Sequence, residues 1–194
     1  ISVAGTGAVA VNGALTGNVI SNAVLSYIDN STVLAGVDVA DVVVNSAAAV
    51  GLLASSKSRI ISTTVGVGGA GAVAVNATGF GNVITNNVET SIKGGSVVKT
   101  GSDVSLTASE EASISSIGLS VAGSGVTSVS VIAGANVITD TIISQIAGST
   151  VDSGGAIDLS ATQDAHIYGF AGGVAASGVV GVQLSLAANV ITNP

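Results

Sequence analysis

Hydrophobic and small polar residues alternate along most of the chain. The stretch 71–76 reads Gly-Ala-Val-Ala-Val-Asn, 103–108 reads Asp-Val-Ser-Leu-Thr-Ala, and 126–131 reads Val-Thr-Ser-Val-Ser-Val. A period of two is typical of β-strands, and the punctuation is Gly-Gly, Gly-Ser and Asn-Ser rather than proline. We therefore expect six or seven short strands in every 54 residues or so. Only the Ala-rich stretch 45–56 leaves room for a short helix.

A four-residue motif, Asn-Val-Ile followed by Ser or Thr, recurs four times at spacings of 64, 54 and 53 residues. A Gly lies 11 residues before each Asn, and a Val lies 15 residues before it. Ten residues after the Asn an Ile recurs in the three complete copies, followed five residues later by a Val (Val33, Val97 and Val151). Such fixed spacing indicates a structural repeat. The repeated positions are Asn18, Asn82, Asn136 and Asn189, Gly7, Gly71, Gly125 and Gly178, and Ile28, Ile92 and Ile146.

A second anchor is an Ala followed six residues later by an Ile, and each Ala precedes the next motif Asn by 28 residues. The variable interval, from Asn to Ala, measures 36, 26 and 25 residues, so the first copy has about ten extra residues within 34–53. We expect a loop there. The repeats are approximately 1–62, 63–117, 118–170 and a partial 171–194, within one domain. The Ile positions of this anchor are Ile60, Ile114 and Ile167.

Repeated strands with small inward residues predict an all-β fold, a parallel β-solenoid whose coils stack about 4.8 Å apart. Three strands per coil would make each repeat two coils of about 27 residues, and three coils of about 18 is the alternative. The two-coil count requires that equivalent Asn residues lie two coils apart. In that case the four Asn side chains bond to backbone at turns and not to one another.

Composition supports thin layers rather than one thick core. The chain has 194 residues, of which 47% are hydrophobic but only 2% aromatic, with 27 Gly, one Pro and no Cys. A conventional core relies on large aromatic and aliphatic side chains, whereas a solenoid needs many small ones. The absence of Cys from the sequence excludes a disulfide scaffold and a thiolate metal site.

Charge is sparse and acidic. Eleven acidic and four scattered basic residues give a net charge of −7, which disfavours nucleic-acid binding. Four stretches of about 28 residues contain no charged residue, a length that raises the question of membrane crossing. Because they alternate with period two and contain Ser, Thr, Asn and Gly, we expect no membrane span. No signal peptide opens the chain, and Ile1 looks like a cut into a longer protein.

The single His is the first residue to consider for a hydrolytic or proton-transfer role. His166 lies between Asp164 and Tyr168, and alternation places these three on one face with Ile167 on the other. Because Ile167 matches two other repeat positions, its face is expected to point inward and His166 outward. Glu110 and Glu111 form the only acidic pair, and both are expected to be exposed turn residues. We assign no catalytic residue, no cofactor and no metal site, and we expect no enzymatic activity.

The stretches 96–109 (Ser-Val-Val-Lys-Thr-Gly-Ser-Asp-Val-Ser-Leu-Thr-Ala-Ser) and 149–164 resemble the repeats of filamentous haemagglutinin-like proteins. The Gly-rich stretch 3–12 before the first motif is similar to the leukotoxin-type large adhesins of that group. The resemblance implies a right-handed parallel β-helix from a very large bacterial exoprotein, secreted or displayed on the cell surface.

Three functions follow as hypotheses. The first is a structural or adhesive segment, a stalk whose partners are neighbouring repeats and possibly a host or neighbouring-cell surface. The second is an extracellular filament subunit that stacks end to end through open strand edges. The third is a carbohydrate-active enzyme on a β-helix, which would need clustered carboxylates.

Overall fold

The computed structural model describes residues 1–193, and regular structure there consists of β-strands and no helix. Alternating small and β-branched residues favour strands, and five of these strands are far longer than expected, at 21 residues each. The strands are β1 (Ser2–Thr6), β2 (Val9–Asp29), β3 (Thr32–Ala35), β4 (Val50–Ala70), β5 (Val73–Lys93), β6 (Val97–Thr100), β7 (Val104–Ser124), β8 (Thr127–Thr139), β9 (Thr141–Ile146), β10 (Thr150–Ser153), β11 (Ile157–Ser177) and β12 (Val180–Thr192).

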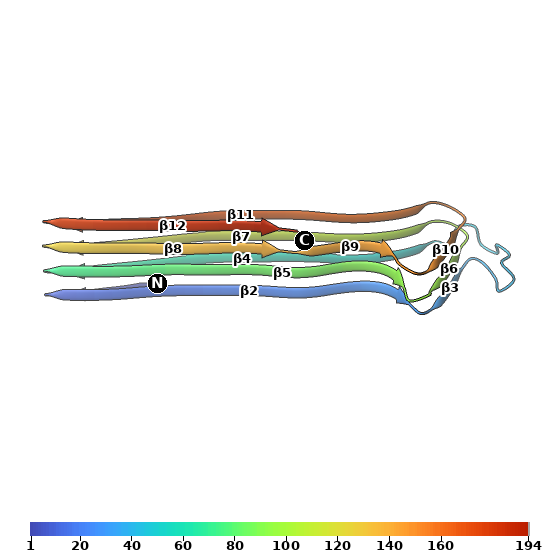
Figure 1. Ribbon diagram of the computed structural model, residues 1–194, viewed down its shortest axis with the longest axis horizontal. Coiled ribbons are helices and arrows are strands. Elements are labelled where there is room, and N and C mark those ends of the chain that lie inside the picture. Colours follow the sequence, from blue (N-terminus) through green and yellow to red (C-terminus); the bar gives the residue numbers. More distant parts are fainter. Residues whose placement is uncertain (194) are drawn as a thin grey trace.

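The strands form three parallel sheets. Sheet A has the order β1-β4-β7-β11, sheet B has the order β12-β8-β5-β2 with β9 also paired to β5, and sheet C has the order β10-β6-β3. Each coil runs along sheet A, turns, returns along sheet B and closes through the short sheet C (Figure 1). A 21-residue strand is about 70 Å long while four coils stack to only about 14 Å, so the molecule is a long, flat blade. The predicted parallel β-solenoid is confirmed.

The number of coils per repeat differs from the prediction. Val9 pairs with Val73, Val73 with Thr127 and Thr127 with Val180, so one turn of the solenoid takes 64, 54 and 53 residues, the spacings of the sequence repeat. Each repeat is therefore one coil, and the prediction of two coils, like the alternative of three, is wrong. Glycines inside the long strands caused the error, because they were interpreted as turns.

The coil is right-handed. In Figure 1 the nearer sheet B runs from left to right, the more distant sheet A runs from right to left, and successive coils step upward. Parallel strands joined by crossovers almost always take this hand because of the strand twist.

The recurring Gly before each motif Asn forms the tight turn between sheets A and B. A Cβ added at Gly71 would lie 2.1 Å from the Gly7 carbonyl oxygen, and one at Gly125 would lie 2.4 Å from that of Gly71. The same approach recurs at Gly178, 2.3 Å from the oxygen of Gly125. Backbones of successive coils thus approach so closely at this end that only glycine fits.

The extra residues of the first copy form an irregular segment at the opposite end, beside sheet C. Residues 36–49 lie between β3 and β4, within the range 34–53, and contain turns and one isolated bridge from Val37 to Val43. The Ala-rich stretch that left room for a helix forms part of this segment and the start of β4. At its tip, Lys99 on β6 forms an ion pair with Asp41 at 2.5 Å.

The interior changes character along the blade. Beside sheet C it is aliphatic, with Leu52, Ile92, Val98, Val104 and Leu106 packed together. Near the middle, Ile60, Ile84, Ile114 and Ile138 form a second cluster. Beyond this cluster, toward the Gly turns, the interior between sheets A and B carries mainly Asn, Ser, Thr, Gly and Ala, together with Phe80 and Ile132. The inside of this solenoid is therefore polar over much of its length.

Candidate functional site

A ladder of asparagines runs through the interior along the stacking direction. The side-chain Nδ2 of Asn18 donates to Oδ1 of Asn82, Asn82 donates to Asn136, and Asn136 donates to Asn189, each at 2.8 Å. These residues lie within strands of sheet B, not at turns, and Asn136 also donates to Oγ of Ser116 on sheet A. The expectation of backbone bonds at turns was wrong, because equivalent Asn residues are one coil apart.

A second polar row contains the buried acids. The backbone N–H of Asn22 donates to Oδ1 of Asn86 at 3.1 Å, and that of Asn86 donates to Oδ1 of Asp140 at 2.8 Å. Glu110 on β7 faces this row from sheet A, and its Oε1 accepts a hydrogen bond from Nδ2 of Asn86 at 2.6 Å. Gln163 on β11 donates to Oδ2 of Asp140 at 3.4 Å.

The carboxyl groups of Glu110 and Asp140 are buried, and the pKa of each is raised. Glu110 is 3% exposed and Asp140 0% exposed. Burial raises the pKa of each above its ordinary value, and the polar groups of Ser56 and Asn86 at Glu110, and of Asn86 and Gln163 at Asp140, offset only part of that effect. Oε2 of Glu110 has no hydrogen-bond partner among the described residues. Among residues 1–193, no basic side chain pairs with either carboxyl group, so no opposite charge offsets the effect of burial.

The expected exposure of the acidic pair holds for only one member. Glu110 and Glu111 are adjacent on β7 and therefore face opposite sides of sheet A. Glu111 points outward and forms an exposed ion pair with Lys57 one coil away, at 2.8 Å. Glu110 is buried. The two carboxylates therefore do not converge on one substrate.

His166 lies on the outer face of sheet A, as alternation predicted. Its Nε2 is 2.7 Å from Oδ1 of Asp164, and both side chains are more than half exposed. The Tyr168 ring centroid is 6.4 Å from that of His166. In register, His166 follows Ser113 and Arg59 of the preceding coils. The pair resembles two members of a hydrolytic triad, but among the described residues no hydroxyl group is hydrogen-bonded to His166.

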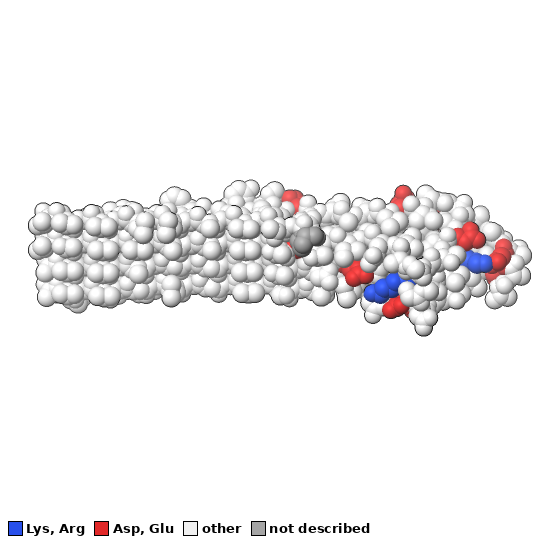
Figure 2. All heavy atoms as spheres, viewed as in Figure 1, with Lys and Arg blue, Asp and Glu red and all other residues white. Residues whose placement is uncertain are grey.

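Charge is confined to one half of the blade. Residues 1–21, 61–85, 115–139 and 168–193 contain no charged residue, and together they form the half that ends in the Gly turns. We call this the charge-free half. Figure 2 shows acidic and basic side chains gathered toward the sheet C end, with an uncharged surface over the rest of the visible face.

The outer face of sheet B in this half is apolar. It consists of the odd-numbered positions of 9–19, 73–83 and 127–137 and the even-numbered positions of 180–190. Every one is Val, Leu, Ala or Gly except Thr127. We call this surface the sheet B apolar face. The solenoid is thus inverted here, with Asn and Ser inside and aliphatic residues outside.

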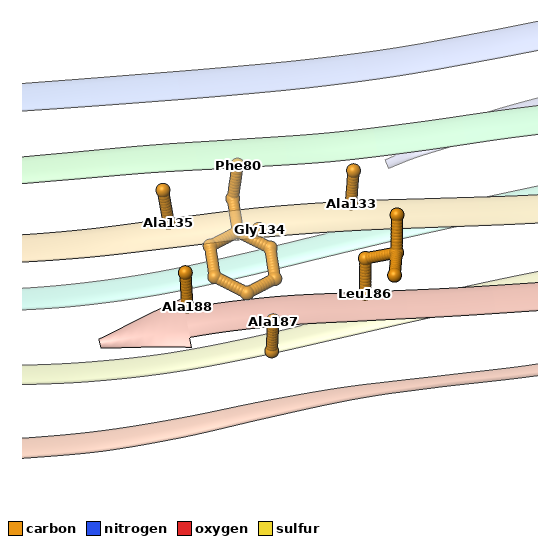
Figure 3. Close-up of a pocket in the computed structure, with 7 residues that line it drawn as sticks. All are labelled: Phe80, Ala133, Gly134, Ala135, Leu186, Ala187 and Ala188. Carbon is orange, nitrogen blue, oxygen red and sulfur yellow. The ribbon is translucent and has the colours of Figure 1, made fainter.

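A hollow of about 400 Å³ lies within the sheet B apolar face. Its lining comes only from β5, β8 and β12, with Ala133, Ala135, Leu186 and Ala188 around the backbones of Gly134 and Ala187 (Figure 3). Phe80 reaches from β5 beneath Gly134, where a Cβ would lie 2.0 Å from Cζ of the ring. We call this depression the Ala133 hollow.

Comparisons with known proteins identify no relative. No family model, no curated protein and no solved structure matches the chain. Within residues 1–193, no group of three or more His, Cys, Asp or Glu side chains is arranged to hold a metal ion. No helix in the same range is long and apolar enough to cross a membrane.

Two features were missed at the sequence level. Glu110 has the same strand parity as Ile114, whose face was expected to point inward, so its burial was readable from the alternation. The apolar outer face was readable in the same way, since Asn82 inside requires Val83 outside. Both were overlooked because charged residues are expected outside and aliphatic residues inside.

Proposed function

We propose that the chain is a structural segment of a large bacterial exoprotein, a stiff stalk that holds binding regions away from the cell. The observation that carries the proposal is the in-register stack of coils, in which each layer repeats the last and the outermost strands leave their ladder edges open. Further coils of the same kind can be added to such edges without a new core. The resemblance to haemagglutinin-like repeats supports secretion or display at the cell surface.

The proposal has two direct tests. Antibodies against the chain are expected to label intact cells of the bacterium that produces it, and labelling only after lysis would contradict surface display. A stalk has no turnover. A screen with glycans, esters and peptides that found an activity abolished in both His166→Ala and Asp164→Asn, but kept in the outer-face control Ser105→Ala, would contradict the structural role and revive the enzyme hypothesis.

A second candidate function is an extracellular filament built by end-to-end stacking. The open edges of β2 and β12 favour it, because each pairs with a strand on one side only. Unpaired parallel edges add strands readily. Electron microscopy of concentrated protein is expected to show fibres with an axial repeat of about 4.8 Å. Monodisperse particles with no fibres would contradict this function.

A further inference from the structure

The sheet B apolar face is large, flat and uncovered. It spans 11 residues along each strand and four coils, which gives about 700 Å² from the usual strand dimensions. Stable protein interfaces bury about 800 Å² per partner, so one such face is close to the area that a dimer needs. Monomeric soluble proteins rarely leave so large an apolar patch in water.

The face is self-complementary in shape. Leu15 is 87% exposed and stands out from the first coil, leaning over Gly79, where a Cβ would lie 2.7 Å from its Cδ2. The Ala133 hollow lies in the third and fourth coils. Leu15, Gly79 and Ala133 occupy the same position along their strands. One projection and one depression thus sit at the same distance from the Gly turns, at opposite ends of the stack.

We infer that the sheet B apolar face pairs with the same face of a second copy of the chain, with Leu15 of each copy seated in the Ala133 hollow of the other. A two-fold axis parallel to the strands keeps the position along the strand and reverses the order of coils. It therefore brings the first coil of one copy opposite the last coils of its partner, and both Leu15 contacts form at once. Two sheets packed in this way lie about 10 Å apart.

A protein partner fits this face better than a lipid surface does. The face carries rows of small side chains with Gly and Ala between Val ridges, and this relief matches the close packing of two sheets. It has no aromatic side chain, whereas membrane-contacting surfaces usually place aromatic residues at the lipid boundary. The hydroxyls of Thr139 and Thr192, which are 3.0 Å apart, begin the polar rim next to the charged half.

Sedimentation equilibrium of the whole chain and of two arginine variants tests this inference. Leu15→Arg introduces a charge where the side chain enters the apolar hollow of the partner, and because each dimer contains two copies of it we expect the dimer dissociation constant to rise at least about 100-fold. Leu25→Arg is the matched control, on the same strand and outer side but outside the face, and it should leave dimerisation within about twofold. Unchanged circular dichroism would show that both variants fold.

Cysteine cross-linking gives a second readout, and it is clean because the chain has no Cys. Leu15→Cys mixed with Ala133→Cys is expected to form mixed disulfide dimers, and Leu25→Cys mixed with Ala133→Cys is not. A wild-type chain that stays monomeric at about 100 µM, well above typical dissociation constants for such interfaces, would overturn the inference. A dimer insensitive to Leu15→Arg would also overturn it. Flotation of a monomeric chain with phosphatidylcholine vesicles, lost in Leu15→Arg, would replace the second copy by a lipid surface.

Discussion

Asn82 donates its side-chain N–H to the side-chain oxygen of Asn136, at 2.8 Å and in the same register position one coil further on. The contact shows that residues 54 apart in the sequence lie in adjacent layers of the solenoid. Asn82 and Asn136 each donate and accept along the stack, so these buried amides satisfy one another. The ladder also penalises any slip of one coil against the next, because a slip would leave buried amides unpaired.

The ladder predicts a large cost for truncating one Asn. Asn136→Ala removes the acceptor of Asn82 and the donor to Ser116, and both of these side chains are buried. We expect the free energy of unfolding to fall by about 2–4 kcal/mol, since each orphaned buried group costs about 1–3 kcal/mol. Urea denaturation measures this. Asn87→Ala, at an exposed position of the same sheet, should change stability by less than about 0.5 kcal/mol. Equal effects would show that the ladder contributes nothing.

The two faces of sheet A predict opposite responses to substitution. Ile114 is fully buried in the middle cluster, and Ile114→Asp would place an unpaired charge there. We expect loss of more than about 4 kcal/mol, enough to unfold the chain or to prevent its expression in soluble form. His166→Ala on the outer face should leave the melting temperature nearly unchanged. Equal melting temperatures for the two variants would contradict the assignment of faces.

The buried carboxyls predict that stability rises on mild acidification. Because the folded pKa values of Glu110 and Asp140 are raised, the folded chain binds more protons than the unfolded chain between the unfolded and folded pKa values. The stabilisation is complete below the ordinary carboxyl range and is lost as pH rises through the folded pKa values. Glu110 faces Ser56, Asn86 and Asp140, and Glu111, on the opposite side of the sheet, adds a smaller repulsion that also raises the pKa of Glu110.

Glu110→Gln tests the source of this effect. Removing the buried charge should stabilise the chain at pH 7 by about 1–3 kcal/mol and flatten the dependence of stability on pH. The measurement is urea denaturation between pH 4 and pH 8. Glu111→Gln, on the exposed face, should leave the dependence as it is. A wild-type chain whose stability increases steadily from pH 4 to pH 7 would contradict the account.

The glycines opposite Phe80 predict a double-mutant coupling. A Cβ at Gly134 would overlap the Phe80 ring, so Gly134→Ala must displace the ring and should cost about 1–3 kcal/mol. Phe80→Ala alone leaves a cavity and should cost about 3–5 kcal/mol. In the double variant the new methyl meets no ring, so the combined cost should be less than the sum. Gly123→Ala, where an added Cβ meets no other atom within 4 Å, is the control. Additive costs would contradict the contact.

Much of the fold could be predicted from the sequence because alternation and spacing are local signals. The stack of equivalent Ala and Ile positions is seen in the register of Ala54 with Ala108 and of Ile60 with Ile114. The number of residues in one coil could not be predicted in this way, because it depends on contacts between residues that are distant in the sequence. Gly118 and Gly134 look like turn residues, but they lie within strands. Glycine is needed at these strand positions because the Phe80 ring occupies the space that a side chain would fill. A glycine in a turn can be distinguished from a glycine within a strand only when the residue packed against it, here Phe80, is known.

A one-residue offset shows the same limit. The sequence spacing aligned Val97 with Val33 and Val151, whereas the structure pairs Val98 with both. The turn before β6 contains Gly94 and Gly95, both with positive φ, and takes up one more residue than the turns of the other coils. Val98 is therefore the residue that joins the aliphatic cluster beside sheet C. A shift of one residue exchanges inner and outer faces, and no spacing rule detects it.

The most direct test of one coil per repeat is disulfide formation in the double variant Val83→Cys and Val137→Cys. These residues are paired in adjacent strands and point outward, and the chain has no other Cys. With one coil per repeat their Cα atoms lie about 4.8 Å apart, within the range that a disulfide bridges, whereas two coils per repeat would separate them by about 9.6 Å. We predict an intramolecular disulfide in nearly all molecules after mild oxidation. A folded variant that forms no intramolecular disulfide would contradict the one-coil repeat.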